Sequence, residues 1–166
     1  MLWEKCKEIE SDIVEMRREL HQIPELGFHL PKTRAYVIRK LEEIGVPYIL
    51  SEKDSSIVAT MKCARPGKTL AFRADMDALP IQEETGRSFA SLHNSCMHAC
   101  GHDAHTAMLL AALQILYPHK EELSGEIRFL FQTAEELAKG AAILIEEGGI
   151  KGGRCHFRDA YRQYFR

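Results

Sequence analysis

The chain has 166 residues, of which 45% are hydrophobic and 28% are charged, and its formal net charge is -2. This composition is that of an ordinary soluble globular protein and excludes a disordered, collagen-like or low-complexity chain. A near-neutral charge gives no broad attraction for phosphate backbones or anionic lipid, so we expect neither nucleic-acid nor membrane binding. The length allows one domain and hardly two.

Apolar runs and cysteines in the sequence bear on the cellular location of the chain. No stretch reaches the roughly 20 apolar residues of a membrane span, and the charged start, Met1–Lys5, precedes no apolar run of the signal-peptide kind. The five cysteines are an odd number at irregular spacing, which favours reduced thiols or a metal ligand over a disulfide framework. We therefore expect a cytoplasmic location.

The first half of the chain predicts two helices and two strands. Apolar residues recur every three or four positions from Trp3 to Leu20, which indicates an amphipathic opening helix. A second helix is expected from Pro31 to Ile44, with Gly45 as its C-terminal cap. Two β-rich runs follow, and the turn signal Arg65-Pro66-Gly67 between them predicts that they pair with each other; the runs are Ser56–Met61 and Thr69–Ala74.

The second half continues the alternation of helices and strands. A helix is expected at Met108–Leu116, a strand at Glu126–Phe131 and a further helix at Ala141–Glu147. Interleaved helices and strands predict an α/β layered domain. Such folds place their functional residues at strand ends and helix starts.

Histidines and cysteines concentrate just before the apolar run Met108–Leu116. Four of the eight histidines fall between His93 and His105, and the same window holds Cys96 and Cys100. Imidazole and thiolate bind borderline-soft divalent metals, so the segment His98–His105 is a candidate metal site. Gly101 would let the backbone bend so that Cys100 and His102 face one ion. The next helix is expected to start near Asp103, which would cap that helix or orient a ligand histidine.

Two other interpretations of this cluster stay open. A histidine-rich turn can simply pack, although packing does not require two thiols and four imidazoles. A structural zinc site can also be drawn from Cys96, Cys100, His102 and His105. It is the weaker reading, because structural sites usually join two separated pairs of ligands, whereas these four lie within ten residues.

Two adjacent carboxylates, Glu135 and Glu136, directly follow the expected strand at Glu126–Phe131. Metal-dependent hydrolysis needs one carboxylate to hold the ion and another to move a proton between water and the leaving group. Successive side chains of an extended segment diverge, so one glutamate would face the metal and its neighbour the water. The alternative is a solvated acidic start to the next helix, which suits the helix dipole.

A third cluster lies in Arg73–Pro80, where a strand leads into Asp75 and Asp77. Two carboxylates at a strand end can orient metal ligands. Aspartate and proline also end strands in general, so this signal is weak by itself.

In this order, the segments resemble the zinc-dependent aminoacylase and carboxypeptidase type metallohydrolases. The branch that they resemble most is the N-acyl-amino-acid amidohydrolases, such as hippurate hydrolase, indole-acetyl-amino-acid hydrolase and N-acetyldiaminopimelate deacetylase. The resemblance covers about residues 10 to 150, and four motifs carry it: Arg17–Gly27, Arg73–Pro80, Met97–His105 and Phe131–Glu136.

The resemblance implies a catalytic domain of the three-layer, mixed-sheet, zinc-exopeptidase-like α/β fold. It also implies two divalent metal ions, Zn, Mn or Co, with Cys100, His102 and Glu136 as metal ligands and Glu135 as the general base. Cys100 would be the bridging or first-metal ligand. Arg73 stands where the peptidase branches have a metal-binding histidine, so Asp75 supports the ligands at most. Thr133 replaces a frequent proline, and Leu137–Gly140 a glycine-rich stretch.

The reaction implied is hydrolysis of the amide bond of N-acyl amino acids or small peptides, with a small-molecule substrate. In this family the metals polarise the scissile carbonyl and activate a water, and Glu135 would carry its proton to the departing amine. The resemblance also implies that family members often form homodimers through a lid domain, which we expect to be absent from this chain. The acyl group and the amino acid are not readable from these residues.

The resemblance stops after Ile150, which divides the chain into 1–150, the N-terminal portion of a catalytic domain, and 151–166, an aberrant tail. Codons permitted for residues 152–166, read one base forward, allow a strand close to the family's Val-Asp-Ala-Ile-Phe-Gly-Met-His, with its metal-binding histidine at Ala160. We therefore hypothesise a frameshift near Lys151. A truncated chain of this kind is expected to hold one metal ion or none and to be weakly active or inactive.

The competing function class is therefore a non-catalytic fragment or pseudo-enzyme, with one zinc at most bound through Cys100, His102 and Glu136. A structural single-zinc module that contacts a partner is the third reading, and it would need Cys96 and His105 as ligands.

Overall fold

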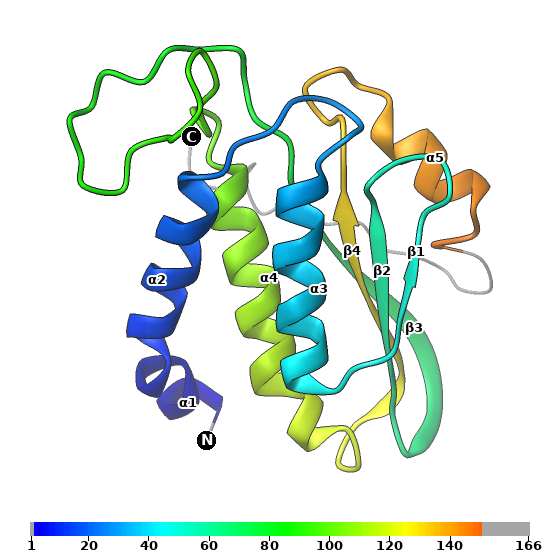
Figure 1. The fold of residues 1–166 in the computed structure, drawn as a ribbon. Coiled ribbons are helices and arrows are strands. Elements are labelled where there is room, and N and C mark those ends of the chain that lie inside the picture. Colours follow the sequence, from blue (N-terminus) through cyan, green and yellow to red (C-terminus); the bar gives the residue numbers. More distant parts are fainter. Residues whose placement is uncertain (1, 151–166) are drawn as a thin grey trace, which may run out of the picture.

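The computed structural model describes residues 2–150, so the expectations for the tail at 151–166 lie outside the described residues. A four-stranded sheet separates two helical layers (Figure 1). Three helices cover one face of the sheet and a short helix covers the other, which confirms the predicted three-layer α/β class. The helices are α1 (Leu2–Glu8), α2 (Glu10–His21), α3 (Pro31–Ile44), α4 (His102–Leu116) and α5 (Gly140–Glu146), with a 3-10 turn at Tyr117–His119.

The helix predictions are confirmed with one difference at the start of the chain. The expected opening helix is two helices, α1 and α2, interrupted at Ile9. The second helix has the predicted bounds, and Gly45 ends it in the left-handed conformation at φ 78°. The apolar run Met108–Leu116 lies in α4, which begins at His102, close to the start expected near Asp103, so the candidate metal-binding segment runs into its first turn.

The sheet is mixed, with the strand order β1-β2-β4-β3. Its strands are β1 (Tyr48–Leu50), β2 (Ile57–Lys62), β3 (Arg65–Asp75) and β4 (Ser124–Gln132). The predicted pairing of the two β-rich runs is wrong, because β4 lies between β2 and β3, antiparallel to the first and parallel to the second. The long connection through α4 carries the chain from β3 back to a parallel neighbour, as parallel strands require.

The predicted turn at Arg65-Pro66-Gly67 is part of β3 itself. The register of β3 against β4 shifts between Arg65 and Thr69, so these residues form an irregularity in the strand. A Cβ atom on Gly67 would lie 2.8 Å from the backbone nitrogen of Gly125, which shows why the bulge needs glycine. Pro66 and Gly67 therefore belong to a bulge where two backbones approach closely. Proline and glycine are common in turns as well, so the sequence alone does not distinguish a bulge from a turn.

The main core lies between the sheet and helices α2, α3 and α4. Its largest fully buried side chains come from both layers: Leu20, Leu41, Leu110, Leu113, Ile57, Met61, Phe129 and Phe131. The core on the other face of the sheet is smaller, and there Leu144 of α5 packs on Ala71 and Leu130. Alternate residues of β4 thus enter opposite cores, as the period of a strand requires.

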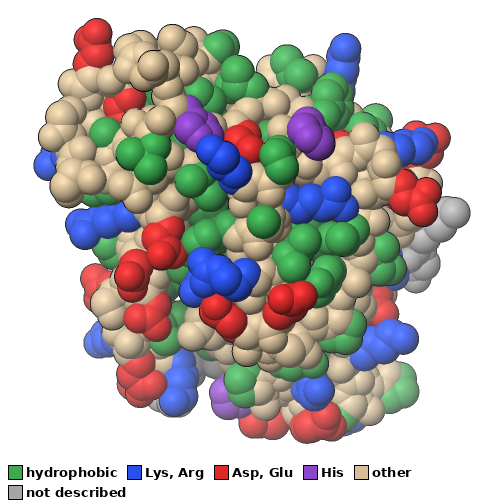
Figure 2. Space-filling model, viewed as in Figure 1, with side chains coloured by type: hydrophobic (Ala, Val, Ile, Leu, Met, Phe, Trp, Pro, Cys, Tyr) green, Lys and Arg blue, Asp and Glu red, His purple; other side chains and the backbone are tan. Residues whose placement is uncertain are grey.

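The surface carries both signs of charge. Figure 2 shows acidic and basic side chains interspersed over the face seen in Figure 1. Within residues 2–150, no helix combines the length and the apolar character needed to cross a membrane.

Three segments meet at one edge of the sheet and position the candidate site. Strands β3 and β4 are parallel and end together, because Asp75 pairs with Gln132. The backbone N–H of Met76 donates to the carbonyl of Gln132 at 2.8 Å and extends this contact by one residue. A long loop, residues 76–101, then leads to the start of α4, which begins beside the same edge (Figure 1).

Candidate metal centre

The start of α4 presents His102 to the ends of the strands. Gly101 has φ 89°, so the predicted backbone bend is confirmed, and His102 is the first helical residue. The Nδ1 atom of His102 donates to the carbonyl oxygen of Asp77 at 2.8 Å. With Nδ1 engaged in this way, Nε2 is the atom that faces the glutamates: it lies 3.6 Å from Oε2 of Glu135 and 3.9 Å from Oε1 of Glu136.

The two glutamates lie in a turn, and this corrects the geometry expected from the sequence. Strand β4 ends at Gln132, Ala134 adopts the left-handed conformation at φ 51°, and Glu135 and Glu136 follow in the turn. Their side chains therefore do not diverge as in an extended segment, and both approach His102. The acidic-helix-start alternative is also wrong, since α5 begins only at Gly140 and has no acidic residue in its first turn.

The structure brings the three sequence-predicted metal ligands together. Single ligand atoms of Cys100, His102 and Glu136 all lie within 4.8 Å of one another. The Oε1 atom of Glu136 is buried and has no hydrogen-bond partner, an arrangement that costs free energy unless something coordinates this oxygen. Thiolate, imidazole and carboxylate in one cluster form a donor set suited to zinc and similar ions, so the residues present fit a divalent metal.

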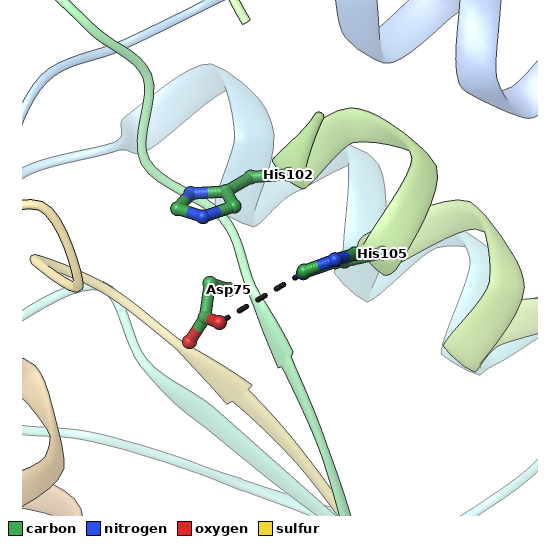
Figure 3. A group of neighbouring side chains, drawn as sticks. All are labelled: Asp75, His102 and His105. Atoms are coloured by element: carbon green, nitrogen blue, oxygen red, sulfur yellow. Dashed lines mark ion pairs between the residues drawn. The ribbon is translucent and has the colours of Figure 1, made fainter. Parts of the chain in front are cut away.

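A second group shares His102 with the first. Ligand atoms of Asp75, His102 and His105 also lie within 4.8 Å of one another, with Asp75 at the end of β3 and His105 one turn into α4 (Figure 3). The carboxylate of Asp75 lies 3.8 Å from Nδ1 of His105 and 3.2 Å from Nε of Arg73. Because the Arg73 guanidinium already neutralises Asp75, this group is the less favourable place for another cation.

The local charges hold protons on two candidate ligands. Burial alone would lower the pKa of His102, but hydrogen bonds to Asp77 and the charge of Asp75 raise it to about 9. Cys100 is exposed as a residue, yet partial burial of its thiol and the hydrogen bond to Glu136 raise its pKa to about 11. Both groups would therefore release a proton when they bind a metal.

The same environment acts on Glu135. Burial, followed by the negative charge of Asp75, raises the pKa of Glu135 above its ordinary value, while His102 opposes this effect. A carboxylate whose pKa moves toward neutral pH is better suited to accept and return a proton.

The other cysteine and histidines of the window have different surroundings. Cys96 is buried and belongs to neither ligand group among residues 2–150. The Nδ1 atom of His93 bonds to the carbonyl of Pro24 at 2.7 Å, which fixes the loop. His98 is 3% exposed, both its ring nitrogens lack hydrogen-bond partners, and burial lowers its pKa to about 4.

Asp103 lies in the first turn of α4, where its Oδ1 accepts the N–H of Ala104 at 2.9 Å, but it does not hold the cap position and does not contact a proposed ligand. Helix α4 has Gly101 at its cap position without a side-chain hydrogen bond. The Oδ2 atom of Asp103 instead lies 2.7 Å from Nδ1 of His21 and 2.8 Å from Nε of Arg17, which ties α4 to α2. The motif Arg17–Gly27 gives no signal for these contacts, because His21 and Asp103 are 82 positions apart in the sequence.

Known proteins are similar to this chain in sequence and in fold. Residues 71–162 match the profile of Peptidase family M20/M25/M40. The N-acyl-L-amino acid amidohydrolase of Geobacillus stearothermophilus is 44% identical over 146 residues, which make up 88% of this chain and 40% of that enzyme. The N-acetyl-L-cysteine deacetylase of Bacillus subtilis is 42% identical over 87% of this chain and 35% of its own length.

A solved structure agrees with these matches. A Bacillus subtilis protein described as a dinuclear metal binding peptidase from the M20 family has a TM-score of 0.84 and 41% identity to this chain. The match covers 89% of this chain and 42% of that one, so the chain spans about 40% of the length of such relatives. The profile covers more than half of the chain, and both its sequence and its fold agree with the relatives. The chain belongs to Peptidase family M20/M25/M40.

Proposed function

We propose that residues 1–150 form the N-terminal portion of a metal-dependent amidohydrolase site, which cleaves the amide bond of N-acyl amino acids or small peptides. The observation that carries the proposal is the convergence of Cys100, His102 and Glu136 within 4.8 Å, beside the carboxylate of Glu135. In the proposal the first three residues hold the metal and Glu135 is the general base.

A divalent metal at this position would polarise the scissile carbonyl and lower the pKa of a bound water. The residues of the chain supply the remaining steps. Glu135 lies beside His102 without sharing the ligand group of Cys100, so its carboxylate is free to accept a proton at Oε2 and pass it to the leaving amine. His102 keeps Nε2 available because its Nδ1 donates to the carbonyl of Asp77.

The substrate class is supported by the names of the relatives. These include an N-acyl-L-amino acid amidohydrolase, an N-acetyl-L-cysteine deacetylase and an N-acetyldiaminopimelate deacetylase, whose named substrates are small N-acylated amino acids. We extend this class, and the homodimer common in the family, to the present protein as proposals. A cytoplasmic location is also a proposal, supported by the free thiols of Cys6, Cys63, Cys96 and Cys100.

Residues 2–150 hold one favourable ligand group, that of Cys100, and a less favourable group that shares His102 with it, while the related solved protein binds two metals. We therefore propose that this chain binds one metal ion or none and turns over slowly if at all. The second candidate function, a non-catalytic single-metal fragment, rests on the same observation. The frameshifted tail remains our proposal, and the nucleotide sequence downstream of codon 151 tests it.

Metal content and hydrolysis distinguish these functions. Purified protein is loaded with Zn²⁺, Mn²⁺ or Co²⁺, its metal is counted by elemental analysis, and N-acetyl and N-benzoyl amino acids serve as substrates. Turnover that Glu135→Gln abolishes, with the metal content kept, supports the amidohydrolase, and Glu84→Gln in the exposed loop is the matched control. One bound metal without turnover supports the fragment. Absence of both metal and turnover also supports the fragment, and it contradicts the amidohydrolase.

A further inference from the structure

The carboxylate of Asp77 lies at the centre of the candidate site, although it belongs to neither ligand group. Its side chain is fully buried, with no exposed surface. A buried carboxylate costs several kcal/mol unless hydrogen-bond donors or positive charges surround it, so its partners indicate what it holds in place.

Its partners are the backbones of the two glutamates. The Oδ1 atom of Asp77 accepts the N–H of Glu135 at 3.1 Å, and Oδ2 accepts the N–H of Glu136 at 3.1 Å. One carboxylate thus holds two successive amides, and these are the amides of the proposed general base and the proposed metal ligand. Such pairs of neighbouring N–H groups are suited to binding an anionic group.

This contact accounts for the strained turn before the glutamates. Ala134 adopts φ 51°, which is unfavourable for a residue with a Cβ atom. Ala134 lies two residues after the end of β4 and directly before the two N–H groups that donate to Asp77. The hydrogen bonds to a buried charge offset this local strain.

Asp77 also contacts the third functional group. Its carbonyl oxygen accepts Nδ1–H of His102 at 2.8 Å, and its Oδ1 lies 3.5 Å from the same nitrogen. Asp75, the other carboxylate of the segment, is paired with Arg73 and makes no comparable contact with the glutamates. Asp77 therefore contacts all three elements of the site: it follows β3, its carboxylate holds the turn after β4, and its carbonyl accepts a hydrogen bond from the first residue of α4.

We infer that Asp77 is a positioning residue: its carboxylate sets where Glu135 and Glu136 lie relative to His102, and thereby sets metal affinity. The inference rests on the proposed function, because it assigns His102 and Glu136 to a metal. Substitution of the Asp77 side chain keeps the backbone carbonyl that accepts Nδ1–H of His102. A change in metal affinity should therefore arise from movement of the turn that holds Glu135 and Glu136. Loss of such a supporting contact typically weakens metal binding 10- to 100-fold.

The test combines Asp77→Asn with Asp54→Asn as a matched control. Asparagine keeps the size of the side chain but offers one acceptor oxygen where Asp77 offers two. Asp54 is also buried and supports the end of the same strand through Thr133 Oγ1 at 2.5 Å, but it contacts neither glutamate amide. Titration with Co²⁺, followed by thiolate absorption, should show 10- to 100-fold weaker binding for Asp77→Asn and less than a threefold change for Asp54→Asn.

Amide hydrogen exchange gives a readout that needs no metal. In Asp77→Asn, the amides of Glu135 and Glu136 should exchange faster, while those of Phe129 and Leu130 in β4 keep their protection. Unchanged exchange at the two glutamates would overturn the inference, and so would equal Co²⁺ affinity. If the unmodified chain takes up no Co²⁺, the proposed function fails, and the exchange data still decide whether Asp77 holds the turn. Should Asp77→Asn not fold, Asp77→Glu, which displaces both acceptor oxygens, gives the same measurements with the same expected direction.

Discussion

The Nε2 atom of His102 lies 3.6 Å from Oε2 of Glu135, although the two residues come from different elements and are separated by β4. The contact exists because α4 begins at the edge of the sheet where β4 ends. The contact brings the imidazole of His102 and the candidate base Glu135 together in the protein without a metal ion. The chemistry of this position then depends on which protons the cluster holds.

Metal uptake should release protons, and its affinity should rise with pH. The pKa of His102 is about 9 and that of Cys100 about 11, so both are protonated at neutral pH without metal. Coordination requires neutral imidazole and thiolate, hence about two protons leave per ion and affinity rises up to about 100-fold per pH unit between pH 7 and 9. Calorimetric titration with Zn²⁺ in buffers of different ionisation enthalpy measures this release. A pH-independent affinity would contradict the ligand assignment, and Cys100→Ser should halve the number of protons.

Much of this candidate site was predictable from the sequence, because its proposed ligands lie in short motifs. His102 and Cys100 flank a glycine, and the glutamates follow a strand, so residue types and order indicate a metal centre. The position of Asp77 was not predictable. Its role depends on hydrogen bonds to amides 58 and 59 positions away, which only the folded chain brings together.

The same distinction applies to the fold. The bounds of α3 followed from local periodicity and caps, since Gly45 in the left-handed conformation ends this helix. The order of the strands could not be predicted from the sequence, since Pro66 and Gly67 are equally compatible with a turn and with a bulge. The choice between them depends on β4, which enters the sheet more than fifty residues later and pairs with both earlier strands.

Asp103 should contribute strongly to stability. It is buried and bonds Arg17 and His21, which joins α4 to α2. Its replacement in Asp103→Ala leaves the buried ring of His21 without this partner, and we expect the free energy of unfolding to fall by about 3 kcal/mol. Urea unfolding measures the change. As a control, Glu8→Gln removes the exposed pair with Lys5 and should cost less than about 0.5 kcal/mol; equal effects of the two substitutions would contradict the prediction.

His98 should make the protein less stable in acid. Its pKa is about 4 in the folded chain and 6.5 ordinarily, so between these values the unfolded chain binds a proton that the folded chain does not. The free energy of unfolding therefore falls as the pH drops from 6.5 to 4, by on the order of 3 kcal/mol from this residue. In His98→Leu this part of the slope should disappear, with a change within about 1 kcal/mol at pH 7, because two unpartnered nitrogens are removed. Parallel slopes for the two proteins in urea unfolding would refute the assignment.

Gly140→Ala should damage both stability and metal binding. A Cβ atom at Gly140 would lie 1.6 Å from the carbonyl oxygen of Thr133, so the backbone between Thr133 and Gly140 must shift. Overpacking of this kind costs about 3 kcal/mol. Because the backbone that must move includes the turn with Glu135 and Glu136, Co²⁺ affinity should fall together with stability.

The control for this substitution is Gly45→Ala, at the end of α3. Gly45 has φ 78° and open space around its Cβ position, so alanine there brings only the strain of the left-handed conformation, about 1 kcal/mol. Its Co²⁺ affinity should match that of the unmodified chain once both proteins are folded. If Gly140→Ala lost stability but bound Co²⁺ normally, the glutamates would not depend on the path of this turn. Comparison of unfolding and metal titration in the two variants thus separates general destabilisation from displacement of the site.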